Sequence, residues 1–107
     1  MKELHSQDFD EFIRSNRVAV VDFWAPWCSP CIAMEPALKR IESEARDIAI
    51  AKLNVDENPE VAREYGVMSI PTLIVFINGR EMDRIIGFLS EDVLRERLSN
   101  YSGSLSP

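Results

Sequence analysis

Two cysteines, Cys28 and Cys31, are the residues whose types and spacing point most clearly to chemistry. They are the only cysteines in the 107-residue chain, and Ser29 and Pro30 separate them. On a helix, residues three apart have Cβ atoms about 5–6 Å apart, whereas a disulfide needs roughly 4 Å between them. A small local adjustment therefore closes the bond. The pattern predicts a pair that switches between dithiol and disulfide.

The two sulfur atoms are expected to play different roles. Cys28 precedes a helical pattern, and the unpaired N–H groups and positive dipole end of a helix favour a thiolate there. We therefore expect Cys28 to be the exposed nucleophile. Cys31 lies one turn inward and is expected to be the resolving thiol. Cys28 would attack a substrate disulfide, and Cys31 would then attack Cys28 to release the product.

Other roles for a cysteine pair need residues that the sequence supplies sparingly. A structural zinc site takes four ligands, and beyond the pair only His5 offers a further nitrogen or sulfur ligand. Cysteine-protease chemistry needs a positioned histidine, and His5 is more typical of an exposed surface residue. An inert buried thiol pair is the structural alternative. A helix start flanked by Trp24 and Trp27 is an unusual place for such a pair.

A single acid, Asp22, interrupts the apolar stretch Val18–Phe23 that precedes the cysteines. A carboxylate in such a setting usually has a partner or a perturbed pKa. Burial would raise the pKa of Asp22 and make it a proton acceptor for Cys31. Lys52, inside the next predicted strand, could instead form a purely structural ion pair with it. The sequence leaves both interpretations of Asp22 open.

The elements that must position these residues follow from the hydrophobic pattern. Val18–Phe23 is apolar on both alternating faces, as in a central strand that is covered on both sides. A helix that begins at the cysteines is predicted to run to about Ala45, with Pro30 suited to its first turn. Ile48–Val55 is the next predicted strand. This strand–helix–strand order implies parallel pairing through a right-handed crossover.

The segments before and after this unit complete a mixed α/β domain. Residues 2–5 are predicted as a short edge strand, and residues 7–15 as a helix capped by Ser6. Asn58-Pro59 is predicted to begin a short helix that ends at Gly66.

A hairpin and a helix are predicted for the C-terminal third. Thr72–Ile77 and about Glu81–Ile86 are expected to pair around the two-residue turn Asn78-Gly79, and Ser90 is expected to cap a last helix. Residues 102–107 have no packing pattern and are expected to form a flexible tail. The prediction is one domain over residues 1–107, with helices on both faces of the sheet.

The overall composition narrows the classes of function. With a net charge of −6, the chain is poorly suited to bind nucleic acid or an anionic membrane surface. No apolar run approaches the ~18 residues of a membrane span, and the N-terminal residues are too polar for a secretory signal. We therefore expect a cytoplasmic protein. An exported protein that has lost its leader is also compatible with this N-terminus.

Several segments, in order, resemble the thioredoxin family. They are VVDFWAPWCSPC, the following helix with Pro36, KLNVDENP, YGVMSIPTLIVFINGR and IIGFLS, and they lie between about Phe9 and Leu98. The resemblance implies a thioredoxin fold, with a central mixed five-stranded sheet flanked by four helices on both faces. It also implies reduction of protein disulfides, with electrons returned by a thioredoxin reductase. No bound cofactor is implied beyond a redox-active Cys28–Cys31 disulfide.

The resemblance also implies roles for individual residues. Cys28 would be the nucleophile, Cys31 the resolving thiol and Asp22 the buried proton-transfer group, with Lys52 beside it. Pro71 would be a cis-proline that faces the disulfide, and the Ile70 backbone would pair with an extended substrate. The residues implied to support the site from behind are Trp24 and Asp56. The residues implied to form an apolar docking surface for client proteins are Trp27, Ile70, Pro71, Ile86, Gly87 and Phe88.

The sequence departs from the family pattern close to the cysteines. Ser29 stands where glycine is usual, and it could cap the helix or donate a hydrogen bond to the Cys28 thiolate. With Pro30, it is therefore expected to tune the redox poise of the pair. Ile32 replaces a residue that is basic in many relatives, which leaves a more apolar rim.

The main prediction is a thiol-disulfide oxidoreductase that acts as a protein-disulfide reductase and is expected to be a monomer. One alternative is the same fold with the redox poise of an oxidase or isomerase. Another is a binding subunit for which the thiols are dispensable. An acidic chain of this kind offers no surface for nucleic acid or membranes as its main partner.

Overall fold

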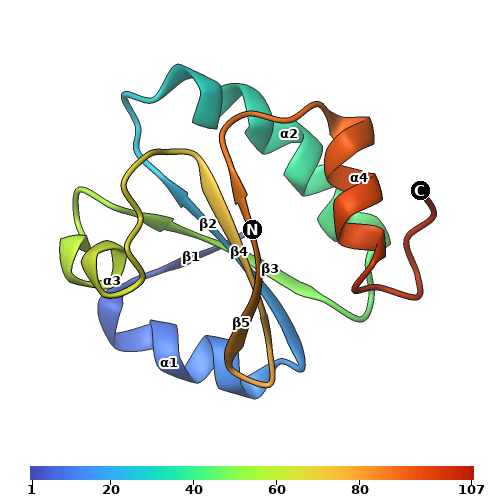
Figure 1. The fold of residues 1–107 in the computed structure, drawn as a ribbon, viewed down its shortest axis with the longest axis horizontal. Coiled ribbons are helices and arrows are strands. Elements are labelled where there is room, and N and C mark those ends of the chain that lie inside the picture. Colours follow the sequence, from blue (N-terminus) through green and yellow to red (C-terminus); the bar gives the residue numbers. More distant parts are fainter.

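A five-stranded sheet forms the centre of the molecule, with the strand order β1-β3-β2-β4-β5 (Figure 1). The computed structural model describes residues 1–107. The strands are β1 (Lys2–Leu4), β2 (Val18–Trp24), β3 (Ala49–Asn54), β4 (Thr72–Ile77) and β5 (Arg80–Ile86). The helices are α1 (Ser6–Ser15), α2 (Ser29–Glu44), α3 (Pro59–Glu64) and α4 (Glu91–Ser99). The predicted five-stranded mixed sheet with four helices is confirmed.

The central strand β2 has one parallel and one antiparallel neighbour. β3 runs parallel to it and brings Lys52 into register with Asp22, because the chain returns through the crossover helix α2. β4 runs antiparallel to β2 and brings Leu73 into register with Asp22. Side chains alternate along a strand, so residues in register point to the same face. Asp22, Lys52 and Leu73 therefore share one face of the sheet.

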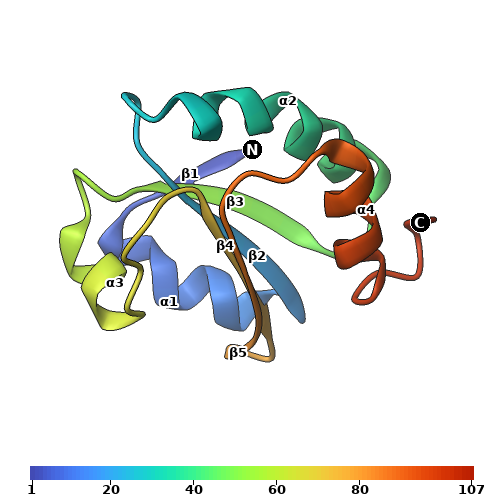
Figure 2. The same cartoon turned by 45° about the horizontal axis from the view of Figure 1, so that its top comes forward.

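Helices cover both faces of the sheet, with α2 and α4 on one side and α1 and α3 on the other (Figure 2). β2 contributes to both cores: Val18 and Val20 pack on the α2 and α4 side, and Ala19 and Val21 on the α1 and α3 side. Every residue from Val18 to Phe23 is buried. Burial on both faces explains why this strand is apolar almost without interruption.

One helix begins at a residue other than the predicted one. α1 begins at Ser6, and its N-cap is His5, whose backbone N–H donates to Asp8 Oδ2 at 3.3 Å. The prediction that Ser6 caps this helix is therefore wrong. The Ser6 hydroxyl instead donates to Asn58 Oδ1 at 3.0 Å, a residue 52 positions along the chain. α2, in contrast, begins at Ser29, one residue after Cys28, in agreement with the prediction that Cys28 precedes this helix.

The remaining predicted boundaries agree with the structure more closely. Asn58 and Ser90 are the N-caps of α3 and α4, as predicted. Asn78 and Gly79 have φ values of 52° and 80°, the positive values that a two-residue hairpin turn requires. None of the helices combines the length and the apolar character needed to cross a membrane.

The C-terminal segment packs further than its sequence suggests. Leu105 is 6% exposed and belongs to the core on the α2 and α4 side. Asp47, in the loop after α2, accepts hydrogen bonds from the hydroxyls of Ser102 and Ser104 and from the Gly103 N–H at 2.7 Å. The expectation that residues 102–107 lack packing is therefore corrected as far as Leu105.

Candidate active site

Cys28 and Cys31 form a disulfide at the point where β2 leads into α2, with Cα atoms 5.3 Å apart. Cys28 is the N-cap of α2, and its Sγ accepts a hydrogen bond from the Cys31 N–H at 3.3 Å. The Cys28 N–H in turn donates to the Ala25 carbonyl at 3.1 Å, which folds the loop back on itself. The nucleophile expected from the sequence is thus part of the helix terminus.

Both cysteine side chains are buried in this disulfide form. Cys28 is 4% exposed and Cys31 2%, so the expectation of an exposed Cys28 is wrong for this form. The two side chains pack with Ala25, and Trp24 and Ile70 cover the group. The bond to Cys31 holds the Cys28 sulfur within this apolar cluster. No group of three or more His, Cys, Asp or Glu side chains is placed to bind a metal ion.

Ser29 and Pro30 occupy the first two positions of α2 rather than its cap. The hypothesis that Ser29 caps the helix is wrong because Cys28 takes that place. Ser29 is exposed to solvent. Pro30 lacks a backbone N–H, which costs nothing here because the first N–H groups of a helix have no intrahelical partner.

Asp22 lies buried on the sheet face that α2 covers. It is 2% exposed, and its Oδ1 has no hydrogen-bond partner. Burial, and after it the negative charge of Glu35, raises the pKa of Asp22 from 3.8 to about 7, while Lys52 acts in the opposite direction. A carboxyl group with this pKa exchanges its proton near neutral pH, as the proton-acceptor interpretation of Asp22 requires.

Lys52 does not form the ion pair with Asp22 that the sequence suggested. Its Nζ donates to Glu35 Oε1 at 2.9 Å and lies 4.5 Å from the centre of the Trp24 ring. The physical reason is the path of α2, which brings Glu35 over β3 at a place that remains partly open to solvent. The Lys52 side chain is 18% exposed there, so its ammonium group keeps some hydration.

Glu35 was not among the residues predicted for the site. Its hydrogen bond with Lys52 is the main cause that lowers the pKa of Glu35. One signal in the sequence could have identified it. Glu35 follows Cys31 by four residues, a spacing that places both side chains on one face of a helix.

The two tryptophans beside the pair have different surroundings. The Trp27 Nε1 donates to Asp56 Oδ2 at 2.7 Å, while 68% of the Trp27 residue is exposed. Asp56 therefore fixes a tryptophan at the surface of the site. Trp24 is partly buried below Lys52, and its Nε1 has no hydrogen-bond partner. Of the two residues expected behind the site, Trp24 lies there, and Asp56 contacts the rim.

A loop before β4 faces the cysteine pair from the other side. The Ile70–Pro71 peptide bond is cis, as the resemblance implied. The Thr72 hydroxyl donates to the Ser69 carbonyl at 2.7 Å, and the Gly87 N–H donates to the Pro71 carbonyl at 2.8 Å. These bonds fix the loop next to the end of β5. They bring Ile86 and Gly87 beside Pro71 and Thr72, and the exposed Phe88 follows in the chain, whereas Ile70 packs on the cysteines.

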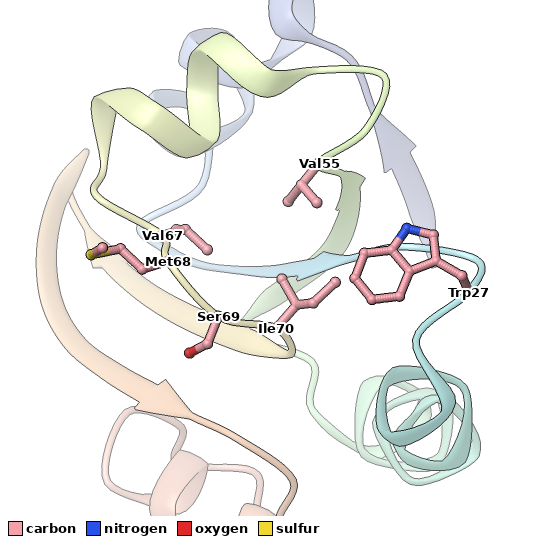
Figure 3. A pocket seen from close by; sticks show the side chains of 6 residues that line it. All are labelled: Trp27, Val55, Val67, Met68, Ser69 and Ile70. Atoms are coloured by element: carbon pink, nitrogen blue, oxygen red, sulfur yellow. The ribbon is translucent and has the colours of Figure 1, made fainter.

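An open cavity of about 310 Å³ lies between this loop and the residues around the pair. In Figure 3 the side chains of Trp27, Val55 and Ile70 point toward a common space, and Met68 projects away from Trp27. Met68 is 96% exposed. The residues that line the cavity are Trp27, Val55, Val67, Met68, Ser69 and Ile70. Of the predicted docking residues, Trp27 and Ile70 belong to this set.

Comparisons with known proteins identify the family. The model of the thioredoxin family matches residues 1–100. The chain is 43% identical over 98 residues to a thioredoxin of Alicyclobacillus acidocaldarius, which covers 91% of this chain and 93% of that protein. The chain belongs to the thioredoxin family. With its disulfide-forming cysteine pair, this thioredoxin is a protein dithiol-disulfide oxidoreductase.

Two further relatives support this assignment. The structure of a thioredoxin from Plasmodium falciparum superimposes with a TM-score of 0.91 at 29% identity, covering 95% of this chain and 100% of that one. A protein of Mycobacterium leprae described as a bifunctional thioredoxin reductase/thioredoxin is 44% identical over 99 residues. That match covers 92% of this chain and 22% of the longer protein.

Proposed function

We propose that this thioredoxin reduces disulfides of client proteins, with Cys28 as the nucleophile and Cys31 as the resolving thiol. The Cys28 thiolate attacks one sulfur of the client disulfide, forms a mixed disulfide and releases one client thiolate. The Cys31 thiolate then attacks Cys28 Sγ, and the second client sulfur leaves as a thiolate. Two electrons pass to the client, and the Cys28–Cys31 pair becomes a disulfide.

The capping position of Cys28 is the observation that carries this proposal. Its Sγ accepts a hydrogen bond from the Cys31 N–H at the beginning of a 16-residue helix. A thiolate at the same place gains from that N–H group and from the positive end of the helix dipole. Cys31 lies inside the first turn instead. This difference favours Cys28 as the group that is ionised first.

Asp22 is the group in this proposal that accepts the proton of Cys31. A resolving thiol must lose its proton before it attacks, and a base with a pKa near the working pH is best suited to take it. Asp22 has a pKa of about 7 because it is buried and because Glu35 is near. The structural alternative, an ion pair with Lys52, has less support because Lys52 is bonded to Glu35.

The client protein is proposed to bind as an extended segment across the loop that contains Pro71. Ile70 lies outside the strands, and its backbone forms no hydrogen bond within the chain, so it is free to pair with a client. Apolar client side chains would enter the cavity beside Trp27 and Ile70. Pro71, Ile86, Gly87 and Phe88 would form the other flank of this docking surface.

A thioredoxin reductase is the partner proposed to return electrons to the Cys28–Cys31 disulfide. The relative from Mycobacterium leprae supports this pairing, because its description combines both activities in one chain. In this proposal the disulfide is the only redox group, the protein acts as a monomer, and its site of action is the cytoplasm.

Trapping of the mixed disulfide tests the roles of the two cysteines. With insulin as the client, the Cys31→Ser variant is expected to accumulate a covalent adduct, because nothing resolves the bond to Cys28. The Cys28→Ser variant is expected to form at least about a hundredfold less adduct. Mass spectrometry under non-reducing conditions measures both. The opposite pattern, with Cys28→Ser as the trapping variant, would overturn the proposal.

The reduction potential of the pair separates a reductase from an oxidase or isomerase. Equilibration of the protein with a defined dithiol buffer gives this value. We expect a reduction potential below that of the cytosolic glutathione pool, which is roughly −220 to −260 mV when determined by biochemical extraction. A value well above that of the pool would mean that Ser29 has changed the poise of the pair, and it would favour the oxidase or isomerase alternative.

A further inference from the structure

Three charged side chains meet between α2 and the sheet, close to the cysteine pair. Glu35 comes from α2, Lys52 from β3 and Asp22 from β2. Lys52 Nζ lies 2.9 Å from Glu35 Oε1, and both side chains are largely buried, at 18% and 21% exposure. No salt bridge joins Lys52 to Asp22, whose Oδ1 is buried without a partner. The one cation near Asp22 is thus bonded to a different acid.

We propose that Glu35 is a positioning residue for the exchange reaction, because it holds the Lys52 ammonium away from Asp22 and so leaves Asp22 free to take up the Cys31 proton. This inference rests on the proposed role of Asp22 as proton acceptor. It adds a residue that acts on Asp22 through Lys52 and makes no contact with the client.

Lys52 is held by two contacts that do not involve Asp22. The first is its hydrogen bond with Glu35, and the second is the Trp24 ring, whose centre lies 4.5 Å from Nζ. Asp22 is the register partner of Lys52 on the adjacent strand. A lysine released from Glu35 therefore lies between two acids on the same sheet face, the exposed Glu3 on β1 and the buried Asp22 on β2. Pairing with Asp22 gains more, because water does not screen the attraction there.

The other charged groups around this face are exposed or paired elsewhere. On the neighbouring strands β4 and β5, the residues in register with Asp22 are Leu73 and then Ile85. The inward residues of α4 on this face are Leu94 and Leu98. On α2, Lys39 lies 3.7 Å from Glu35 on its outer side, at 59% side-chain exposure. The Met1 ammonium group and Tyr101 also pack against this core, but the first pairs with Glu42 and the second donates to Asp83. The reduced cysteines are titratable as well and lie at the beginning of α2.

The electrostatic balance at Asp22 agrees with this arrangement. After burial, the charge of Glu35 is the next cause that raises the pKa of Asp22, and Lys52 lowers it. Glu35 therefore raises the pKa of Asp22 in two ways. Its own negative charge disfavours ionisation of Asp22, and its bond to Lys52 keeps that cation from stabilising the Asp22 carboxylate. Loss of the Glu35 charge removes both effects, so the pKa of Asp22 must fall.

The titration of Asp22 in the oxidised protein tests the inference without any measurement of activity. The pH dependence of the Asp22 side-chain carboxyl ¹³C shift is compared for the wild type, Glu35→Gln and Glu42→Gln. Glu42→Gln is the matched control, since it removes one charge from the same helix, where Glu42 pairs with the N-terminus. We expect the Asp22 midpoint to fall by about one pH unit in Glu35→Gln and to stay at the wild-type value in the control.

A second background separates the two ways in which Glu35 acts. In Lys52→Met, the substitution Glu35→Gln is expected to shift the Asp22 midpoint by less than half as much, because only the direct charge effect remains. An undiminished shift would overturn the part of the inference that runs through Lys52. An Asp22 midpoint that does not move in Glu35→Gln would overturn the whole inference, while the cysteine roles would still stand on the trapping experiment.

The rate of the resolving step links this titration to function. Single-turnover resolution of the insulin mixed disulfide is expected to have a pH midpoint that shifts with the Asp22 midpoint in Glu35→Gln. A rate profile that stays in place while Asp22 shifts would contradict the role of Asp22, and with it the part of Glu35 in the exchange. Thermal unfolding of each variant checks that the fold is intact.

Discussion

Asp22 opposes folding whenever it is ionised, because its carboxylate is 2% exposed and its Oδ1 has no hydrogen-bond partner. Burial is the main cause of its raised pKa, and the charge of Glu35 adds to it. An uncharged residue of the same shape would remove this unfavourable term, but it could not take up a proton. The destabilising effect of Asp22 and its proposed role in proton transfer therefore have the same physical origin.

The stability of the oxidised protein is expected to depend on pH through Asp22. The folded pKa of about 7 lies above the ordinary 3.8, so between these values the folded chain keeps a proton that the unfolded chain has lost. This contribution to stability is complete below about pH 4 and is lost as the pH rises through 7. Over the whole range the loss is about 4 kcal/mol at most.

The substitution Asp22→Asn is therefore expected to remove most of this pH dependence and to raise the unfolding free energy at pH 9 by up to about 4 kcal/mol. Denaturant unfolding of the oxidised protein between pH 4 and pH 9 measures the effect. Asp10→Asn, at an exposed position of α1, is the control and should follow the wild type. Parallel pH curves for Asp22→Asn and the wild type would contradict the prediction.

At the scale of the element, the redox pair is part of the terminus of α2. Cys28 caps the helix with its sulfur, and Ser29 is the first residue within it. A substitution at Cys28 therefore changes both the chemistry and the end of a helix that packs over β2 and β3. A substitution at Ser29 leaves the cap in place.

The contribution of the cap can be measured with the disulfide absent. In the Cys31→Ser background, Cys28→Ala is expected to be less stable than Cys28→Ser by about 1 kcal/mol, because serine is a good N-cap and alanine a poor one. Ser29→Ala in the same background should change the unfolding free energy by less than about 0.5 kcal/mol. Denaturant unfolding gives these values. Equal stability of the two Cys28 variants would show that the cap does not matter.

The sequence predicts the elements well and their contacts less well, for a physical reason. The apolar run Val18–Phe23 and the turn Asn78-Gly79 are local patterns, and both are confirmed. The partner of Lys52 depends on which side chain of α2 lies above β3, and nothing local to Lys52 specifies Glu35. The adjacent strands suggested Asp22 as the partner of Lys52. The path of α2 instead supplies Glu35, which is more exposed to solvent than Asp22.

At the scale of the whole molecule, local sequence patterns also fail to predict the contacts of the C-terminal segment and of the docking surface. Leu105 is a single apolar residue among serines, so no periodicity indicates that it packs on the core. Its neighbours bind Asp47, more than fifty residues earlier in the chain. Met68 likewise belongs to the lining of the cavity only because the loop before β4 lies opposite Trp27.

The exposed Met68 allows a test of docking that leaves the cysteine pair unchanged. Met68→Glu places a charge on the lining of an apolar cavity, so we expect kcat/KM for insulin to fall roughly tenfold. Reduction of the small neutral substrate hydroxyethyl disulfide should remain at the wild-type rate, because it needs no docking surface.

Met82→Glu is the matched control, since Met82 is also exposed but does not line the cavity. It carries the same change of charge on β5, and its expected kcat/KM for insulin is that of the wild type. Equal losses for Met68→Glu on both substrates would mean that the new charge acts on the Cys28–Cys31 pair itself. Equal losses for both variants on insulin alone would instead indicate repulsion from the net charge of the whole protein, which is already −6.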